Sequence, residues 1–246
     1  MIILLVILSC LLGFASDDDI TYEDYQNISY IPEPMIFDLV RPLGSKKGQW
    51  EANTLLIQEH YPELSHSHES PELEYVVMDN LALELEIPGV GGEPDALKGV
   101  LQWTMGHLGN SNKTIHGVQL INQRFIQKDP YNEVTPIYIL GHRFNREYTL
   151  LLMLGDQYRY SSTKHDHFLV FNATIFDVYS HVKEIEFGLE NNILGFGNNF
   201  QFWRITPQIE VVLEDQWKIQ TGFGTLYSYQ YGWESSSSLR VIKEFY

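Results

Sequence analysis

The sequence predicts an all-β protein, a closed antiparallel transmembrane β-barrel of about 12 strands. Three observations predict this fold class: side chains alternate between apolar and polar from Trp50 onward, short and long connections alternate, and the chain ends on an aromatic residue, Tyr246. Aromatic residues make up 13% of the 246 residues, which favours strands because aromatic side chains pack well on a pleated surface. The sequence shows no helical periodicity of useful length.

Residues 1–15 are expected to form a signal peptide. Residues 2–15 are almost all apolar, yet this run is too short for a transmembrane helix, which needs roughly 20 residues. Its length fits the apolar region of a secretion signal, and the small residues Gly13 and Ala15 permit cleavage before Ser16. No Lys or Arg precedes the run, so the terminal amine alone supplies positive charge there.

Residues 16–47 are expected to form an acidic N-terminal extension on the periplasmic side, and residues 48–246 the barrel. Aspartates occupy positions 17–19, and prolines at 32, 34 and 42 discourage regular strand pairing. No second apolar run long enough to span a bilayer follows. Strands would therefore have to cross the membrane, because only helices and closed barrels satisfy every backbone group in lipid.

The clearest alternation lies at residues 81–87. Its odd positions carry large apolar side chains, whereas its even positions are Ala82, Glu84 and Glu86. Because successive strand side chains point to opposite faces, one face is apolar and the other is charged. A helix would scatter the same residues around its whole surface. The pattern recurs at 184–193, 203–213 and 217–226.

Turn-forming residues separate the expected strands. These strands are 48–60, 71–79, 80–88, 96–105, 114–125, 133–142, 147–158, 167–178, 183–193, 200–213, 217–229 and 237–246. Residues 134–140 and 148–154 are apolar on both faces. Either apolar side chains fill part of the lumen, or these two strands are buried on both sides.

The connections between the strands are expected to be short at one end of the barrel and longer at the other, as is typical of outer-membrane barrels. Short turns are expected at 79–80, 143–146 and 214–216, and longer loops at 61–70, 89–95, 126–132, 159–166 and 230–236. The connection 107–113 departs from this rule, because it lies on the short side and is not short. An even number of strands would place both termini on the short-turn side.

The net charge of −16, from 32 acidic and 16 basic residues, excludes some classes of partner. Nucleic acid is not expected as a partner, because phosphate binding needs clustered Lys and Arg. The excess acid either aids solubility or forms a surface or lumen that attracts cations. The single cysteine, Cys10, lies in the expected signal peptide, which excludes a disulfide framework and a cysteine nucleophile in the mature chain.

The polar faces of the expected strands supply candidate lumen-facing residues. These candidates are Glu84, Glu86, Glu184, Glu186, Glu190, Arg204, Glu210 and Lys218. Unpaired buried charge is too costly, so these groups must be hydrated or paired in a narrow barrel. Two hypotheses stay open: a charged lumen that selects solutes, with acidic groups favouring cations, or a salt-bridged plug formed by these side chains, without transport.

Two pairs of histidines are the weak metal candidates: His66 with His68, and His165 with His167. Residues i and i+2 of an extended segment share a face, so each pair could chelate Zn²⁺ or Cu²⁺. Both pairs fall in expected loops on one side of the barrel, where a joint site is geometrically feasible. Solvated loop histidines are the favoured interpretation, so neither a metal nor another cofactor is expected. Catalysis is not expected either, because nothing marks a nucleophile elbow.

Residues 73–88 resemble a hairpin of bacterial outer-membrane proteins grouped as phenol meta-degradation transporters. Those proteins pair a Glu-Tyr strand, here Glu74 and Tyr75, with a turn and a Leu-Glu-Leu-Glu strand that ends in proline, here Pro88. The resemblance extends from about Phe37 to the C-terminus. It implies a barrel in the bacterial outer membrane whose partners are the lipid bilayer and a small, often apolar, solute that crosses it.

Two other classes stay open at this stage. One is a surface structural or adhesive barrel without transport, whose loops contact a partner. The other is a soluble secreted β-barrel binding protein, whose apolar face would point inward. Conductance, loop-dependent attachment and release into the soluble fraction would distinguish the three.

Overall fold

The computed structural model of the chain describes residues 31–37, 39–60, 65–109, 112–127, 130–145, 147–162, 165–177 and 185–245. The expected signal peptide, the first part of the expected extension and the candidate Glu184 lie outside these residues, so those expectations stay predictions.

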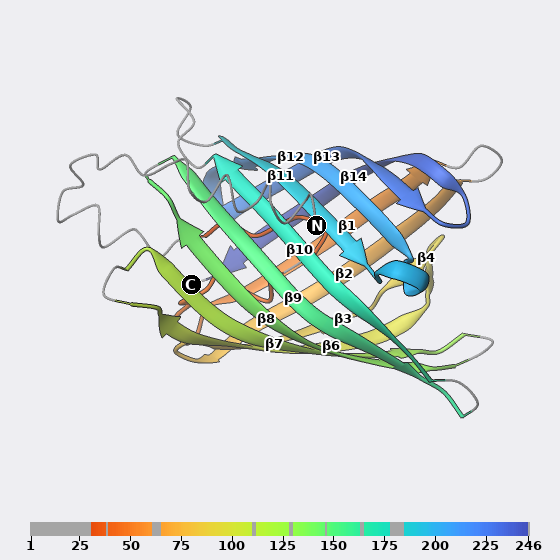
Figure 1. Cartoon of the computed structure of the whole chain (residues 1–246). Coiled ribbons are helices and arrows are strands. Elements are labelled where there is room, and N and C mark those ends of the chain that lie inside the picture. Colours follow the sequence, from red (N-terminus) through yellow and green to blue (C-terminus); the bar gives the residue numbers. More distant parts are fainter. Residues whose placement is uncertain are drawn as a thin grey trace.

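Twelve long strands form one closed antiparallel barrel (Figure 1). They are β1 (Trp50–His60), β2 (Ser65–Met78), β3 (Leu81–Glu86), β6 (Ala96–His107), β7 (Thr114–Phe125), β8 (Asn132–Arg143), β9 (Tyr148–Tyr160), β10 (His165–Asp177), β11 (Ile185–Leu194), β12 (Phe202–Val212), β13 (Trp217–Ser228) and β14 (Gly232–Phe245). Each pairs with the next, and β1 pairs with both β2 and β14, which closes the sheet. The other two of the 14 strands, β4 (Gly89–Val90) and β5 (Glu93–Pro94), form a small hairpin beside β2.

The expected fold class and strand number are confirmed, and each expected strand overlaps one barrel strand. Two strands begin at least five residues earlier than expected, β2 at Ser65 and β14 at Gly232, so the long loops expected at 61–70 and 230–236 are wrong. These stretches are polar, but the ladder uses backbone groups, and β1 pairs along both of them. The end where long loops were expected also contains the short connection 229–231, so connection lengths do not separate the two ends.

The outer face of the barrel is apolar. Leu83, Leu101 and Leu120 are register partners on three neighbouring strands, and each exposes at least 40% of its surface. Exposed apolar residues on the other strands include Leu56, Leu73, Tyr138, Leu154, Leu169, Ile175, Leu189, Ile209, Phe223 and Leu239. A continuous apolar surface of this extent suits a lipid environment, not water. Among the described residues, no helix has the length and hydropathy needed to cross a membrane.

Aromatic side chains mark both ends of this apolar surface. At the end of the barrel where β1 begins and β14 ends, the rings of Trp50 and Phe245 stack with centroids 3.8 Å apart. At the opposite end, Tyr227 and Trp233 lie in register on β13 and β14, with ring centroids 5.2 Å apart. Aromatic girdles at two levels are typical of barrels whose outer face contacts lipid between them.

We expect Leu101→Arg to destabilise the barrel in lipid vesicles by about 2–4 kcal/mol, because it places a charge on the outer face at mid-strand. Urea unfolding in vesicles measures this change. Tyr229→Arg is the matched control, because Tyr229 is 85% exposed in a connection at the barrel end and its replacement should cost about 0–1 kcal/mol. Equal costs at both positions would contradict a lipid-facing surface.

An irregular segment fills much of the lumen. We call residues 31–37 and 39–49 the plug; its red-orange trace runs inside the barrel in Figure 1. Ile31, Met35, Leu39 and Val40 of the plug are fully buried. The expectation of a mostly irregular segment agrees with this part of the chain, but a position on the periplasmic side does not, because the described part lies within the barrel.

The plug packs on the two strands that are apolar on both faces. One buried cluster joins the plug to β7, β8, β9 and β10 and consists of Ile31, Leu39, Leu43, Ile115, Ile137, Ile139, Leu151, Met153 and Phe176. A second joins Val40 to Val76, Ala82 and Val100. The first of the two explanations for 134–140 and 148–154 is therefore the observed one, since apolar side chains fill part of the lumen.

Candidate functional site: the plugged lumen

The structure buries the lumen-facing candidates that it describes. Glu84, Glu86, Glu190, Arg204 and Glu210 are each at most 7% exposed. Glu186 and Lys218 are partly buried and lie near Glu210. Outward side chains of this barrel are exposed, so burial indicates that these residues point inward.

Acidic groups dominate the inner wall. The buried acidic residues are Glu33, Glu51, Glu59, Glu72, Glu74, Glu84, Glu86, Glu133, Glu190, Glu210, Glu234 and Glu244. The buried arginines are Arg41, Arg204 and Arg240, and Lys98, Arg159 and Lys218 are partly buried beside them. The sequence reasoning missed the acids of β1, β2, β8 and β14, although their alternation with outward residues was a usable signal.

Arg240 lies at the centre of one ionic cluster and is fully buried. Its Nη2 lies 3.2 Å from Glu72 and 3.6 Å from Glu74, and its Nε donates to Asn53 Oδ1 at 3.2 Å. The plug contributes a second guanidinium, Arg41, which pairs with Glu51, with Glu244 at 3.3 Å and with Glu74 at 3.9 Å. The plug is therefore ionically bound to β1, β2 and β14.

Three further cations pair with the inner wall. Lys98 on β6 pairs with Glu84 at 3.0 Å and with Glu86. Lys218 on β13 lies 3.1 Å from Glu244 and 3.9 Å from Glu210. Arg204 on β12 pairs with Glu59 on β1. Excellent pairing is what a buried charge requires, so these contacts explain how a narrow barrel contains so many ions.

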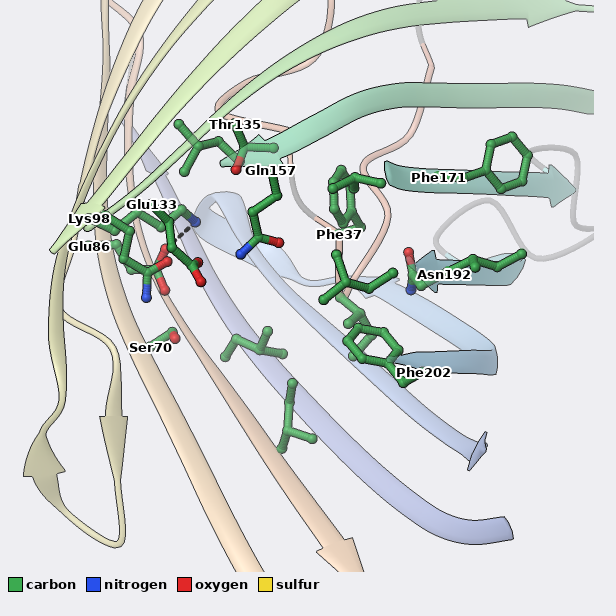
Figure 2. Close-up of a pocket in the computed structure, with 18 of the residues that line it drawn as sticks. Phe37, Ser70, Glu86, Lys98, Glu133, Thr135, Gln157, Phe171, Asn192 and Phe202 are labelled. Atoms are coloured by element: carbon green, nitrogen blue, oxygen red, sulfur yellow. Dashed lines mark ion pairs between the residues drawn. The ribbon is translucent and has the colours of Figure 1, made fainter. Parts of the chain in front are cut away.

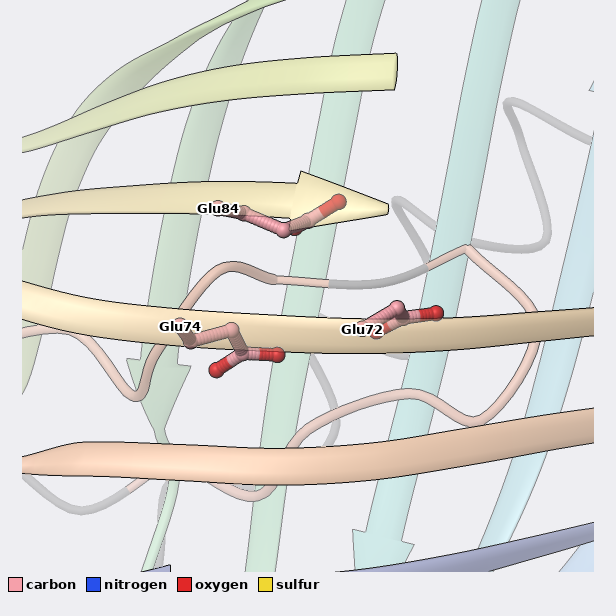
Figure 3. Close-up of side chains that lie close together, drawn as sticks. All are labelled: Glu72, Glu74 and Glu84. Atoms are coloured by element: carbon pink, nitrogen blue, oxygen red, sulfur yellow. The ribbon is translucent and has the colours of Figure 1, made fainter. Parts of the chain in front are cut away.

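Glu72, Glu74 and Glu84 bring carboxylate oxygens within 4.8 Å of one another on β2 and β3 (Figure 3). This spacing alone would suit a cation, because carboxylate oxygens are the ligands that hard divalent ions prefer. However, Arg240 contacts Glu72 and Glu74, and Lys98 contacts Glu84. The protein's own cations thus compensate the cluster, and it is an ion-pair network.

The histidine pairs lie in strands, so the expectation that both occupy loops is wrong. His66 and His68 belong to β2, and His165 and His167 belong to β10, because backbone pairing continues into these polar strand ends. Six steps around the barrel separate β2 from β10 in either direction, so the pairs lie on opposite walls. His68 lies 3.6 Å from Glu59, and His167 lies 3.5 Å from Asp156.

Glu190 binds the backbone of the plug. Its carboxylate accepts hydrogen bonds from three consecutive backbone N–H groups: Met35 at 3.0 Å, Ile36 at 2.9 Å and Phe37 at 2.7 Å. The amides of Asn172 and Asn192 also donate to it, at 3.2 and 2.9 Å. A run of backbone N–H groups forms a concave anion site, so the barrel provides the anion and the plug the site.

Other wall residues also serve the plug's backbone. Gln102 on β6 accepts the Val40 N–H at 3.0 Å and donates to the Arg41 carbonyl at 2.6 Å. Gln208 on β12 accepts the Met35 N–H at 3.0 Å. Beside the same strand, Gly222 on β13 makes room for the plug, because a Cβ at that position would meet the Met35 methyl group.

The plug ends at the turn between β2 and β3. Asp79 accepts a hydrogen bond from the Lys47 N–H at 3.0 Å, and the Lys46 ammonium lies 3.3 Å from it. These contacts lower the pKa of Asp79. Asn80 adopts a φ of 71°, a left-handed conformation that asparagine tolerates better than most residues. The tight turn therefore anchors the plug where it leaves the lumen.

A cavity of about 350 Å³ remains between the plug and the end of the barrel opposite the termini (Figure 2). Its outer limit is set by residues at strand ends, such as Glu86, Leu194 and Phe202. Ile36 and Phe37 line it on the side of the plug. The lumen is thus divided into a part that the plug fills and a part that stays open.

The comparisons with known proteins agree with this architecture. A family model described as HAEPLYID-like matches residues 27–92, the stretch that contains the plug and strands β1 to β3. No curated protein matches the chain. Solved structures are similar in fold: the KdgM porin in complex with disordered oligogalacturonate has a TM-score of 0.63 at 9% identity, over 80% of this chain and 99% of that one.

Two further structures cover the same barrel. The NanC porin has a TM-score of 0.60 at 5% identity, over 77% of this chain and 98% of that one. An outer-membrane channel from Pseudomonas putida F1 has a TM-score of 0.53 at 11% identity, over 87% of this chain and 100% of that one. At such identities the likeness shows the fold, which is that of outer-membrane porins and channels, here with an N-terminal plug in the lumen.

Proposed function

We propose that this protein is a plugged, non-enzymatic channel of the bacterial outer membrane, which passes small molecules when the plug leaves the lumen. Its expected leader at 1–15, and the division into an extension at 16–47 and a barrel at 48–246, belong to this proposal. The apolar outer face with its aromatic ends supports insertion into the bilayer. The fold is shared with porins and channels, and this analogy favours passage of a solute.

One observation carries the proposal: much of the wall around the plug is polar, although β7 to β10 contribute apolar side chains. The side chains of Glu190, Gln102 and Gln208 form hydrogen bonds with the plug's backbone. No disulfide can hold the plug, because the chain has the single cysteine Cys10, and the main chain joins the plug to the barrel at Trp50. A displaced plug would leave a wall rich in carboxylates and amides that water can solvate, beside the apolar side chains of β7 to β10. A barrel with only an adhesive or structural role has no evident need for a hydratable wall behind a removable segment.

The charge of the wall supports neutral or cationic solutes over anions, because rings of acidic side chains select cations. The KdgM complex contains oligogalacturonate, which is an anion. An excess of inward glutamates would repel such a ligand here. Small, often apolar molecules, which the resemblance to phenol meta-degradation transporters implies, are compatible with this charge.

Planar-bilayer recording tests the proposal. We expect discrete openings and, across a KCl gradient, a zero-current potential whose sign indicates cation selectivity, because acidic groups dominate the inner wall. A boiled and an unboiled sample on a detergent gel provide the folding control. Folded protein that never conducts would favour the adhesive or structural alternative, and anion selectivity would contradict the assignment of the wall.

A further inference from the structure

The cavity above the plug has two chemically different walls. Figure 2 shows Glu86, Lys98 and Glu133 on one side and Phe37 and Phe202 on the other. Further apolar residues line the cavity, and they are Leu55, Ile57, Val170 and Leu194. A mostly apolar cavity with a few convergent polar groups is typical of a small-molecule site, and about 350 Å³ lies within the usual size range.

Three polar side chains on neighbouring strands face this cavity and have their hydrogen-bonding groups available to a ligand. They are Gln123 on β7, Thr135 on β8 and Gln157 on β9. In the part of the chain that the structure describes, none of the three forms a side-chain hydrogen bond, whereas most inward amides on the plug side do. Figure 2 shows Gln157 pointing between the two walls, where it can bind a guest.

The charged side chains of the polar wall determine which charge a bound molecule can carry. Glu72, Glu86 and Glu133 line the cavity, and Lys98 is the lining cation. Lys98 is already paired with Glu84 and Glu86, and Arg159 donates to Glu133 at 2.7 Å. An anionic guest would meet carboxylates and no available cation, whereas a hydroxyl or an ammonium group would find acceptors.

We propose that this cavity binds a small amphipathic molecule with one apolar ring and a neutral or cationic hydrogen-bonding end, such as an aryl alcohol or an aryl alkylamine. The ring packs between Phe37 and Phe202, and the polar end contacts Gln157, Thr135 and Glu133. This inference rests on the proposed channel function, for which it names the class of solute. Because Phe37 is one of the residues that Glu190 binds, the guest also contacts the plug.

Three probes that share one ring test the proposal: 2-phenylethanol, 2-phenylethylamine and phenylacetate. Calorimetry and saturation-transfer NMR on the full chain in detergent should show binding of the alcohol and the amine, and binding of phenylacetate at least about tenfold weaker, which is about 1.4 kcal/mol. Equal binding of all three probes would overturn the proposal, since it would indicate only partition into the micelle.

Variants locate the site. Phe202→Ala should weaken binding of both the alcohol and the amine at least about tenfold, because it removes a ring-sized contact. Gln157→Leu should weaken them less and should narrow the difference from phenylacetate. Tyr158→Leu is the control, because Tyr158 neighbours Gln157 on β9 but is 53% exposed on the outer face. Unchanged binding in Phe202→Ala, or equal losses in the control, would refute the assignment.

The two proposals fail in different ways. Binding in detergent does not require transport, so probes that bind to a protein that never conducts would leave the site standing and remove the channel. Conductance without binding of the alcohol or the amine would leave the channel standing and remove the site.

Discussion

Arg240→Met should destabilise the folded barrel by about 3–5 kcal/mol, because it removes a buried guanidinium and leaves the buried carboxylates that contact it with less compensating charge. Arg240 is fully buried, and it contacts Glu72, Glu74 and Asn53. Methionine has a similar length but no charge, so Glu72 and Glu74 would lose their nearest positive group.

Loss of the folded band on a detergent gel, followed as a function of temperature, measures this effect. Arg124→Met is the matched control, because Arg124 is exposed on β7 and its loss should change little. Adding Glu72→Gln to Arg240→Met should recover part of the stability, since it removes one of the two carboxylates that lost their contact with Arg240. An unchanged melting temperature for Arg240→Met would show that the cluster is hydrated and contributes little.

Glu190→Ala should open the channel. It removes an acceptor of three backbone N–H groups of the plug. The Met35 N–H keeps Gln208 as acceptor, whereas the N–H groups of Ile36 and Phe37 lose theirs, and each donor left unsatisfied costs about 1–3 kcal/mol. A loss of about 3 kcal/mol in plug docking corresponds to a roughly hundredfold shift toward the undocked state. We therefore expect a much higher open probability in planar bilayers than for the unmodified protein.

Glu133→Ala is the control for that measurement, because it also removes an inward carboxylate but one that pairs with Arg159 and not with the plug. Limited proteolysis gives a second readout: cleavage within residues 31–49 should accelerate in Glu190→Ala alone. A folded Glu190→Ala protein that stays as closed and as resistant as its parent would rule out the plug as the gate.

The strands were predictable from the sequence because alternation reflects a local property, the opposite directions of successive side chains. Leu83, Glu84 and Leu85 show it in its simplest form, with the glutamate buried and both leucines exposed. Strand ends were less predictable. Ser65 and Gly232 begin strands whose polar side chains look like loops, since the ladder depends on backbone groups that the sequence does not display.

The plug was not predictable, because its place depends on long-range contacts that no periodicity encodes. Pro32, Pro34 and Pro42 correctly indicated an irregular chain, but an irregular chain outside the barrel reads the same. One clue existed in the doubly apolar stretches 134–140 and 148–154, which required something apolar to fill the lumen. Ile31 and Leu39 supply it, at least 70 residues away from either stretch in the sequence.

The closing seam of the barrel gives the plug a role in assembly. Glu51 on β1 lies directly opposite Glu244 on one side and Glu74 on the other, and like charges in facing positions repel. Arg41 contacts all three. The first and last strands therefore pair most favourably when the plug is already in the lumen and Arg41 lies beside these glutamates. The plug would then enter the lumen before β1 pairs with β14. A barrel that closed without the plug would keep the repulsion between Glu51 and Glu244 at this strand pair.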